Sequence, residues 1–421
     1  MHVIQGRVRD YDWGSPDLIP RFFGLPPADF PVAELWLGAH RAAPARCDVG
    51  AGARALSRQD LSDGGQGVRS RAGAGADLRD YIAADPQGSL SAAVAKHHGG
   101  ELPFLLKLIA PAQPLSLQVH PSTEQARVGY QRENAKGIEL DAWDRSYKDE
   151  NHKPELVYAI TKFDALVGFR TPRRILGVLE GLDARLTQEI AEYIRKEPNA
   201  HGVRNAFASL LLEDSRPGAD PVAEVVEACA ERLTKDSPSP RADDMVGTLA
   251  AHYPGDPGIV ASLLLNPVTL KPGEAMFTPA GTVHAYAAGF GLEIMANSDN
   301  VLRAGLTNKF VDVKELLAVV ETVAAPPIRI APERISPIQS TFYAPVDDFE
   351  LSIIELRNAG RTYRLSGGGP RIIASLDGAA DLWVESGQHL LVNTGQAVFV
   401  RADDGPAKVR GIGRFVQASV P

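Results

Sequence analysis

Three short segments of the chain concentrate side chains that can bind a divalent metal ion. They lie at residues 118–120, 151–155 and 284–286, and they contain Gln118, His120, Glu155 and His284. Two imidazoles, one carboxylate and one amide oxygen form a donor set that suits a tetrahedral or slightly expanded site for a borderline divalent ion. A single histidine on a strand is more often structural. The prediction of a metal site therefore rests on the joint pattern.

The first segment has the spacing of a β-strand. Ser116, Gln118 and His120 alternate with apolar residues, so their side chains point to one face of the predicted strand. One strand can then supply two ligands to the same ion.

The elements that must position these residues are mainly strands. Short period-two segments with Gly and Pro turns occupy the chain before Thr171 and resume at Ile259. Between them, residues 172–252 place apolar side chains at helical spacing, which predicts a helical insertion. From about Glu333, short strands, among them 371–376 and 381–386, recur every eight to twelve residues, which favours a second β-sandwich or barrel. Residues 49–76 are rich in Gly, Ala and Arg and predict a solvent-exposed or partly disordered loop.

Composition excludes several classes of protein. The 421 residues carry 44 Lys and Arg against 52 Asp and Glu, and the net charge of −8 argues against bulk attraction to nucleic acid or anionic lipid. We expect no membrane span, because no apolar run is long enough. The amino terminus lacks the apolar core of a secretory signal, and Cys47 and Cys229 are expected to be free thiols. These features predict a cytoplasmic protein.

Several longer stretches resemble the signature blocks of one enzyme family, the type I mannose-6-phosphate isomerases, in the family's order. They are AELWLGAH, PLSLQVHPSTEQA, NHKPELVYAI, YPGDPGIVASLLLN and PAGTVHAYAAGFGLEIMANSDNVLRAGLTNKFVDV. The resemblance extends from Tyr11 to about Lys314. It does not include residues 49–76, and the C-terminal strands match only loosely.

The resemblance implies an architecture and a metal. The expected fold is mainly β, with two cupin (jelly-roll) β domains and an α-helical domain. The catalytic cupin would span residues 1–171 and 256–332, the helical insertion residues 172–255, and a C-terminal cupin-like domain residues 333–421. One zinc ion per chain would be held by Gln118, His120, Glu155 and His284.

The resemblance also implies a reaction, the interconversion of mannose 6-phosphate and fructose 6-phosphate. An aldose and a ketose interconvert by proton transfer through an enediol, which requires a base and stabilisation of negative charge. The residue matching Arg303 is treated as catalytic in the family. As the base we rank Lys153 first, then Asp299, then Glu293, and His152 is a candidate for proton handling or for supporting a ligand.

An acidic protein needs local cations to bind a sugar phosphate. We expect Lys107, Lys309 and Arg303, with the Ser116 hydroxyl, to bind the phosphate. Trp13 and Tyr286 can pack on the apolar faces of the sugar.

Other functions share part of this pattern. An isomerase of a related sugar or sugar phosphate is the nearest alternative. A non-haem iron cupin oxygenase also uses two histidines and a carboxylate, but a glutamine ligand and the cationic segment 303–309 argue against it. A non-catalytic sugar-binding cupin would not need an intact Arg303. The expected partner is a small-molecule substrate, and a monomer is compatible with the sequence.

Overall fold

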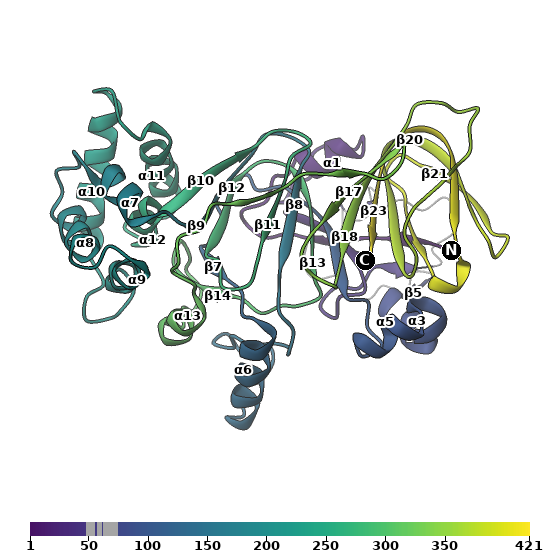
Figure 1. The fold of residues 1–421 in the computed structure, drawn as a ribbon, viewed down its shortest axis with the longest axis horizontal. Helices are drawn as coiled ribbons and strands as arrows, with labels where there is room; N and C mark the ends of the chain where they lie inside the picture. Colours follow the sequence, from purple (N-terminus) through teal and green to yellow (C-terminus); the bar gives the residue numbers. More distant parts are fainter. Residues whose placement is uncertain (48–54, 57–60, 62–74) are drawn as a thin grey trace.

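Strands dominate the computed structural model, which describes residues 1–47, 55–56, 61 and 75–421. Three sheets lie side by side with helices at one end (Figure 1). The predicted predominance of β-structure is confirmed. No helix in the described ranges combines the length and apolar character needed to span a bilayer.

Two of the sheets face each other and are called the sandwich below. The first has five strands in the order β10 (Leu265–Leu270), β9 (Phe163–Phe169), β12 (His284–Ala288), β7 (Gln118–Val119) and β14 (Leu302–Arg303). The second has seven, in the order β15 (Ile328–Ile330), β11 (Ala275–Thr278), β8 (Glu155–Ala159), β13 (Gly291–Ala296), β6 (Phe104–Ile109), β3 (Glu34–Gly38) and β2 (Arg7–Arg9). One apolar cluster joins side chains of both sheets, including Val157 and Ile109 with Val167 and Ala165.

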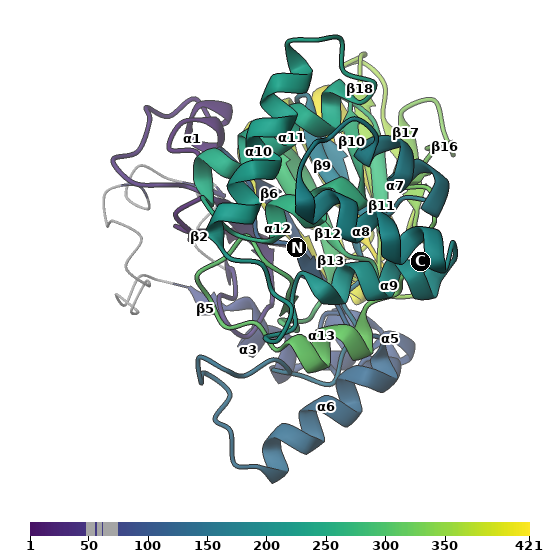
Figure 2. The ribbon, with the colours of Figure 1, turned by 90° about the vertical axis from the view of Figure 1, so that its left-hand side faces the viewer.

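Helices cover the outer face of the five-stranded sheet. They are α7 (Pro172–Leu179), α8 (Arg185–Lys196), α9 (Ala200–Ser209), α10 (Ala219–Leu233), α11 (Pro240–His252) and α12 (Gly258–Ala261). Figure 2 shows them from the side on which they stack. Their apolar faces pack on Leu117, Val119 and Leu166 of the sheet. Because side chains alternate along a strand, this packing turns Gln118 towards the opposite face.

The third sheet has eleven strands in the described residues. The main path is β16 (Glu333–Arg334), β17 (Gln339–Tyr343), β18 (Glu350–Leu356), β23 (Ala407–Ser419), β20 (Arg371–Val384), β22 (Ala397–Val400), β1 (His2–Gln5), β4 (Arg46–Cys47) and β5 (Ala76–Asp77). In addition, β19 (Tyr363–Arg364) pairs with β23, and β21 (His389–Asn393) pairs with β20. The first strand thus joins the C-terminal sheet, although it falls within the predicted first domain.

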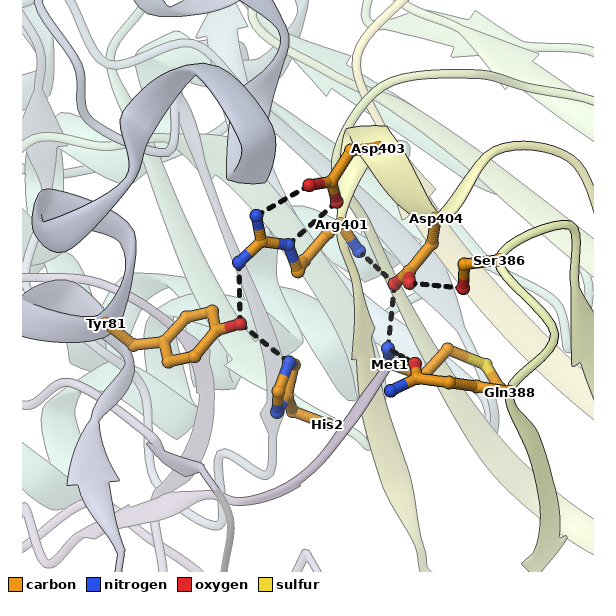
Figure 3. Close-up of a pocket in the computed structure, with 8 residues that line it drawn as sticks. All are labelled: Met1, His2, Tyr81, Ser386, Gln388, Arg401, Asp403 and Asp404. Atoms are coloured by element: carbon orange, nitrogen blue, oxygen red, sulfur yellow. Dashed lines mark hydrogen bonds and ion pairs between the residues drawn. The ribbon is translucent and has the colours of Figure 1, made fainter.

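The amino terminus is held in this sheet by buried polar contacts (Figure 3). The Met1 ammonium lies 2.7 Å from Asp404 Oδ2, and it also donates to Gln388. Asp404 accepts from Ser386 Oγ at 3.0 Å. These bonds fix β1 against the strands near the carboxyl end of the chain.

Two local predictions need correction. Strand β20 is continuous, whereas the pattern predicted two strands at 371–376 and 381–386. A bulge between Ser375 and Asp377, with Gly378 at a φ of 77°, keeps the strand paired through the residues that resemble a turn. Much of the predicted loop at 49–76 lies outside the described residues, but Ala55 and Leu56 are buried in the core rather than exposed.

The remaining α-helices lie around the sheets. They are α1 (Leu18–Phe22), α3 (Leu78–Ala84), α4 (Pro86–Leu90), α5 (Ala92–His97), α6 (Thr123–Ala135) and α13 (Val313–Val319). Helix α6 projects from the sandwich (Figure 1) and begins with a capping box in which Ser122 and Gln125 satisfy each other's backbone amides. It leads directly out of the segment that carries His120.

Candidate metal centre and active site

The register of the five-stranded sheet aligns three predicted site residues. Gln118 on β7 pairs with His284 on β12 and with Arg303 on β14. Directly paired residues of antiparallel strands point to the same face. These side chains therefore share the face opposite the helices, towards the seven-stranded sheet.

Three side chains that could hold a metal ion converge in the space between the two sheets. Glu155 begins β8 on the seven-stranded sheet, and its two carboxylate oxygens lie 3.2 Å from His120 Nε2 and 3.3 Å from His284 Nε2. Donor atoms of all three residues lie within 4.8 Å of one another, and all three residues are buried. This is the cluster predicted from the sequence.

Hydrogen bonds determine which ring nitrogens face the cluster. His120 Nδ1 lies 2.7 Å from the Asn300 carbonyl and His284 Nδ1 lies 3.0 Å from the Thr282 carbonyl. A carbonyl only accepts, so each Nδ1 carries a proton and each ring directs its Nε2 at Glu155.

This arrangement could hold a cation at its centre. Burial and the Lys153 ammonium lower the pKa of His120 to about 4, so its ring is neutral at pH 7. Burial opposes ionisation of Glu155, but the Lys153 ammonium and the histidines hold the pKa of that carboxyl well below its ordinary value. His120 Nε2 is buried without a hydrogen bond in the described structure. Imidazole lone pairs facing a carboxylate fit a metal ion with N and O ligands.

Gln118 lies on the same face of the sheet as His284. Its Nε2 donates to Ser116 Oγ at 3.2 Å, so both polar side chains lie on the predicted face. With the amide nitrogen turned to Ser116, the amide oxygen has no hydrogen bond to another described side chain.

A charged network extends across the seven-stranded sheet. Lys107 on β6 is buried, and its Nζ lies 2.8 Å from Glu293 Oε2 and 3.6 Å from Glu34 Oε1. Burial alone would lower the pKa of Lys107, but the Glu293 and Glu34 carboxylates outweigh it and raise that pKa. The predicted phosphate-binding role of Lys107 does not fit this geometry, because its ammonium is already ion-paired with two carboxylates.

Two further predicted residues contact the metal-binding carboxylate. Lys153 Nζ lies 3.0 Å from Glu155 Oε1, and the lysine is buried. The Tyr286 hydroxyl donates to Glu155 Oε2 at 3.2 Å. Burial and the Glu293 and Glu155 carboxylates raise the pKa of Tyr286 well above its ordinary value, so it stays a neutral donor. Tyr286 is buried in the core between the sheets, which leaves its ring little surface to offer a sugar.

Asp299 belongs to a second hydrogen-bonded group nearby. His40 Nε2 lies 3.4 Å from Asp299 Oδ1, while the Ala42 amide donates to His40 Nδ1 at 3.2 Å. Burial lowers the pKa of His40 to about 4, against the opposing effect of the Asp299 carboxylate, and the Lys107 and Lys153 ammonium groups lower it further. The predicted base Asp299 therefore contacts a histidine that is neutral at pH 7.

Cations gather on another side of the site. The guanidinium of Arg303 has no hydrogen bond or ion pair in the part of the chain that is described, and burial lowers the pKa of Arg303. Partial burial and the charges of Arg303 and Lys148 also lower the pKa of Lys309. Lys309 Nζ lies 5.8 Å from the centre of the Tyr11 ring, which stacks on Trp13 at 5.6 Å. Arg303 and Lys309 therefore form an incompletely neutralised cationic group beside two aromatic rings.

His152 does not join the metal ligands. Its Nε2 lies 2.8 Å from Asp348 Oδ2, and both residues line a separate cavity of about 830 Å³ between the sandwich and the C-terminal sheet. The interpretation of His152 as support for a ligand therefore lacks a contact in this structure.

Sequence reasoning missed several residues at the site. Glu34 is the second carboxylate beside Lys107, and Tyr11 lies between Lys309 and Trp13. The Asn300 carbonyl accepts a hydrogen bond from His120 Nδ1. Tyr11 and Asn300 lie inside recognisable blocks, but neither is a metal-ligand or acid–base type, so type and spacing alone did not single them out.

Comparison with known proteins places this geometry in a family. Residues 1–172 match the family described as phosphomannose isomerase type I, catalytic domain. The chain is 38% identical over 419 residues to a mannose-6-phosphate isomerase of Escherichia coli (strain K12), with 99% of each chain covered. The chain belongs to the type I phosphomannose isomerase family.

Other members of the family agree along most of their length. Mannose-6-phosphate isomerase 1 of Arabidopsis thaliana is 32% identical, with 94% of this chain and 88% of that protein covered. A solved structure described as mannose 6-phosphate isomerase (holo; zinc bound) superposes with a TM-score of 0.84 at 35% identity, covering 100% of this chain and 99% of that one. The predicted family resemblance is confirmed.

Proposed function

We propose that the protein is a zinc-dependent isomerase that interconverts mannose 6-phosphate and fructose 6-phosphate. The observation that carries this proposal is that His120, Glu155 and His284 converge in a buried cluster. On the same sheet face lies Arg303, whose guanidinium has no ion pair among the described residues. Full-length relatives named mannose-6-phosphate isomerase support it. The cationic group favours a phosphorylated sugar over an unphosphorylated one. An oxygenase would not require such a group.

Zinc fits the donor set of this chain. His120, His284 and Glu155 would hold it, with Gln118 as the fourth ligand, and the proton on each Nδ1 would keep both Nε2 atoms aimed at the ion. Bound zinc supplies Lewis acidity and orients substrate oxygens.

Protons would be moved by groups of the chain itself. We keep Lys153 and Asp299 as the leading candidates for exchange between C1 and C2 of the sugar. Glu293 is the weaker candidate, because Lys107 already lies 2.8 Å from its carboxylate. Arg303 would stabilise the oxyanion that develops when the carbon-bound proton leaves.

The phosphate would bind at the cationic group. Arg303 and Lys309 are its main candidates, and Ser116 can donate its hydroxyl proton, because its oxygen is the acceptor in the bond from Gln118. Lys148 adds positive charge close to Lys309. Trp13 is the aromatic surface left for the sugar, since Tyr286 is buried.

We also propose the finer architecture that the family implies. The facing five- and seven-stranded sheets would form one cupin (jelly-roll) domain, built from residues 1–171 and 256–332 and interrupted by helices over 172–255. Strands from both segments lie in both sheets, which supports a single interrupted domain. Residues 333–421 would form the second, cupin-like domain.

The decisive experiment is an isomerase assay with mannose 6-phosphate, coupled to detection of fructose 6-phosphate. We expect activity to disappear after chelation and to return with zinc. His120→Ala and His284→Ala should each lower both zinc content and turnover, since each removes one of four protein ligands. Full activity of metal-free protein, or stoichiometric zinc in both variants, would contradict the proposal.

A further inference from the structure

Asn300 is a fully buried polar residue between Asp299 and the strand that carries Arg303. Its side-chain oxygen accepts the backbone amides of Lys148 at 2.7 Å and Asp149 at 3.2 Å. Burying an amide costs free energy unless its groups are hydrogen-bonded, and this oxygen is bonded twice.

The other end of the Asn300 side chain is bonded as completely. Its Nδ2 donates to the Asp149 carbonyl at 2.9 Å, to Asp149 Oδ1 at 3.0 Å and to the Asn151 carbonyl at 2.9 Å. One side chain therefore fixes the backbone of residues 148–151, which leads directly into Lys153 and Glu155.

The Asn300 main chain reaches a different part of the site. Its carbonyl accepts the Nδ1 proton of His120 at 2.7 Å. Its amide is held by Ser298 Oγ at 3.2 Å, and the neighbouring Asp299 amide donates to Asp149 Oδ2 at 2.8 Å. The carbonyl that orients His120 is thereby tied to the segment that carries Glu155.

We propose that Asn300 is a positioning residue of the metal centre, which holds His120 Nε2 and the Glu155 carboxylate in the relative geometry that the ion requires. This inference rests on the proposed zinc site. It assigns to Asn300 no contact with metal or substrate.

Only an amide satisfies this position. The oxygen end faces two N–H donors and the nitrogen end faces three oxygens, so the side chain must accept at one end and donate at the other. Aspartate has the same shape but cannot donate, and it would place a carboxylate against Asp149. Asn300→Asp is therefore the most informative substitution.

The test measures zinc affinity in a competition with a chelator, without substrate. We expect Asn300→Asp to raise the zinc Kd by about 10–100-fold, in the range seen when residues that orient metal ligands are changed. The direction is informative, because an added negative charge near a cation would by itself strengthen binding. A failed isomerase assay on wild-type protein would affect the proposed function and leave this measurement intact.

The matched control is Asn358→Asp, which adds the same charge at an exposed position. Asn358 Oδ1 accepts only the Gly360 amide at 2.9 Å, and a carboxylate can do the same. Its zinc Kd should equal that of wild type. A folded Asn300→Asp protein with wild-type zinc affinity and turnover would overturn the proposal.

A second measurement covers the case in which the variant does not fold. Nitrogen NMR of the histidine rings in wild-type zinc protein reports the tautomer of each ring. The proposal requires His120 to carry its proton on Nδ1 with zinc bound. A proton on Nε2, or the loss of zinc-dependent signals from His120, would contradict it.

Discussion

Partners, rather than residue type, decide what each charged side chain at the site can do. Lys107 and Lys309 are both lysines within the part of the chain that resembles the family, and the sequence predicted a phosphate role for both. Lys107 lies 2.8 Å from a carboxylate that is 186 residues away in sequence. Lys309 has cations and an aromatic ring as its neighbours. The Lys107 ammonium is already paired with carboxylates, whereas Lys309 forms no ion pair among the described residues, so only Lys309 has its charge available for a ligand.

Arg303 allows the sharpest prediction at this scale. If it stabilises charge during enolisation, Arg303→Ala should lower kcat by roughly two to three orders of magnitude with a smaller effect on KM. Arg303→Lys should recover only part of the loss, because lysine keeps the charge but not the planar fork. Steady-state kinetics of both variants provide the measurement.

The alternative role of Arg303 gives a different result. A phosphate clamp contributes uniform binding, so its loss would raise KM and leave kcat nearly unchanged. Zinc content should remain at the wild-type level in either case. Wild-type kinetics in both variants would remove Arg303 from the active site.

The convergence of His120, Glu155 and His284 was predictable from the sequence, but the contacts that support these residues were not. His120, Glu155 and His284 combine ligand type with recognisable context, and the structure brings them together. Asn300 and Glu34 act through pairings that depend on three-dimensional register, and their residue types are common in ordinary loops and strands. The roles of Lys153, Asp299 and Ser116 stay predictions.

Among the elements, periodicity predicted helices better than it predicted strands. The helical pattern of residues 172–252 corresponds to five consecutive helices, α7 to α11. The strand expected over 116–120 is reduced to the two residues of β7, since Pro114 and Pro121 flank it and a proline cannot donate to the ladder. The prediction divided strand β20 in two around Gly378, but the folded strand stays paired across a bulge between Ser375 and Asp377.

Helices α10 and α11 are joined by a buried ion pair that supports a prediction. Arg232 Nε donates to Asp243 Oδ2 at 2.9 Å, and its Nη1 donates to the Val178 and Glu180 carbonyls near the end of α7. Asp243→Ala leaves the guanidinium buried without its carboxylate, so the free energy of unfolding should fall by about 3–5 kcal/mol. Urea unfolding of zinc-loaded protein measures the change.

The surface ion pair of Arg185 and Glu189 in α8 is the matched control. It spans one helical turn at 2.8 Å and is exposed, so Glu189→Ala should change stability by about 0.5 kcal/mol or less. Zinc affinity should be unchanged in both variants, because neither pair contacts the site. Equal losses in the free energy of unfolding of the two variants would show that burial does not make the Arg232–Asp243 pair contribute more to stability than an exposed pair.

Across the whole molecule, the three sheets form a continuous packed structure. A second apolar cluster joins the seven-stranded and eleven-stranded sheets, with Leu106, Leu156 and Phe277 on one side and Phe342, Leu351 and Phe399 on the other. The strand pattern after Glu333 predicted a β domain there. It did not predict that β1 and β4 would join that domain's sheet, because pairing between distant ends of a chain leaves no local pattern.

This sharing of strands leads to the last prediction, which concerns truncation after Pro332. Removing residues 333–421 would leave β1 without β22, to which His2, Val3 and Ile4 are paired, and would expose the apolar outer face of the seven-stranded sheet. An exposed apolar face with unpaired strand edges favours aggregation. We therefore expect the 1–332 fragment to be insoluble or to lack cooperative unfolding, although it retains every proposed zinc ligand. Circular dichroism and zinc binding of the purified fragment test this. A monomeric fragment that binds zinc with wild-type affinity would show that the first two sheets fold without the third.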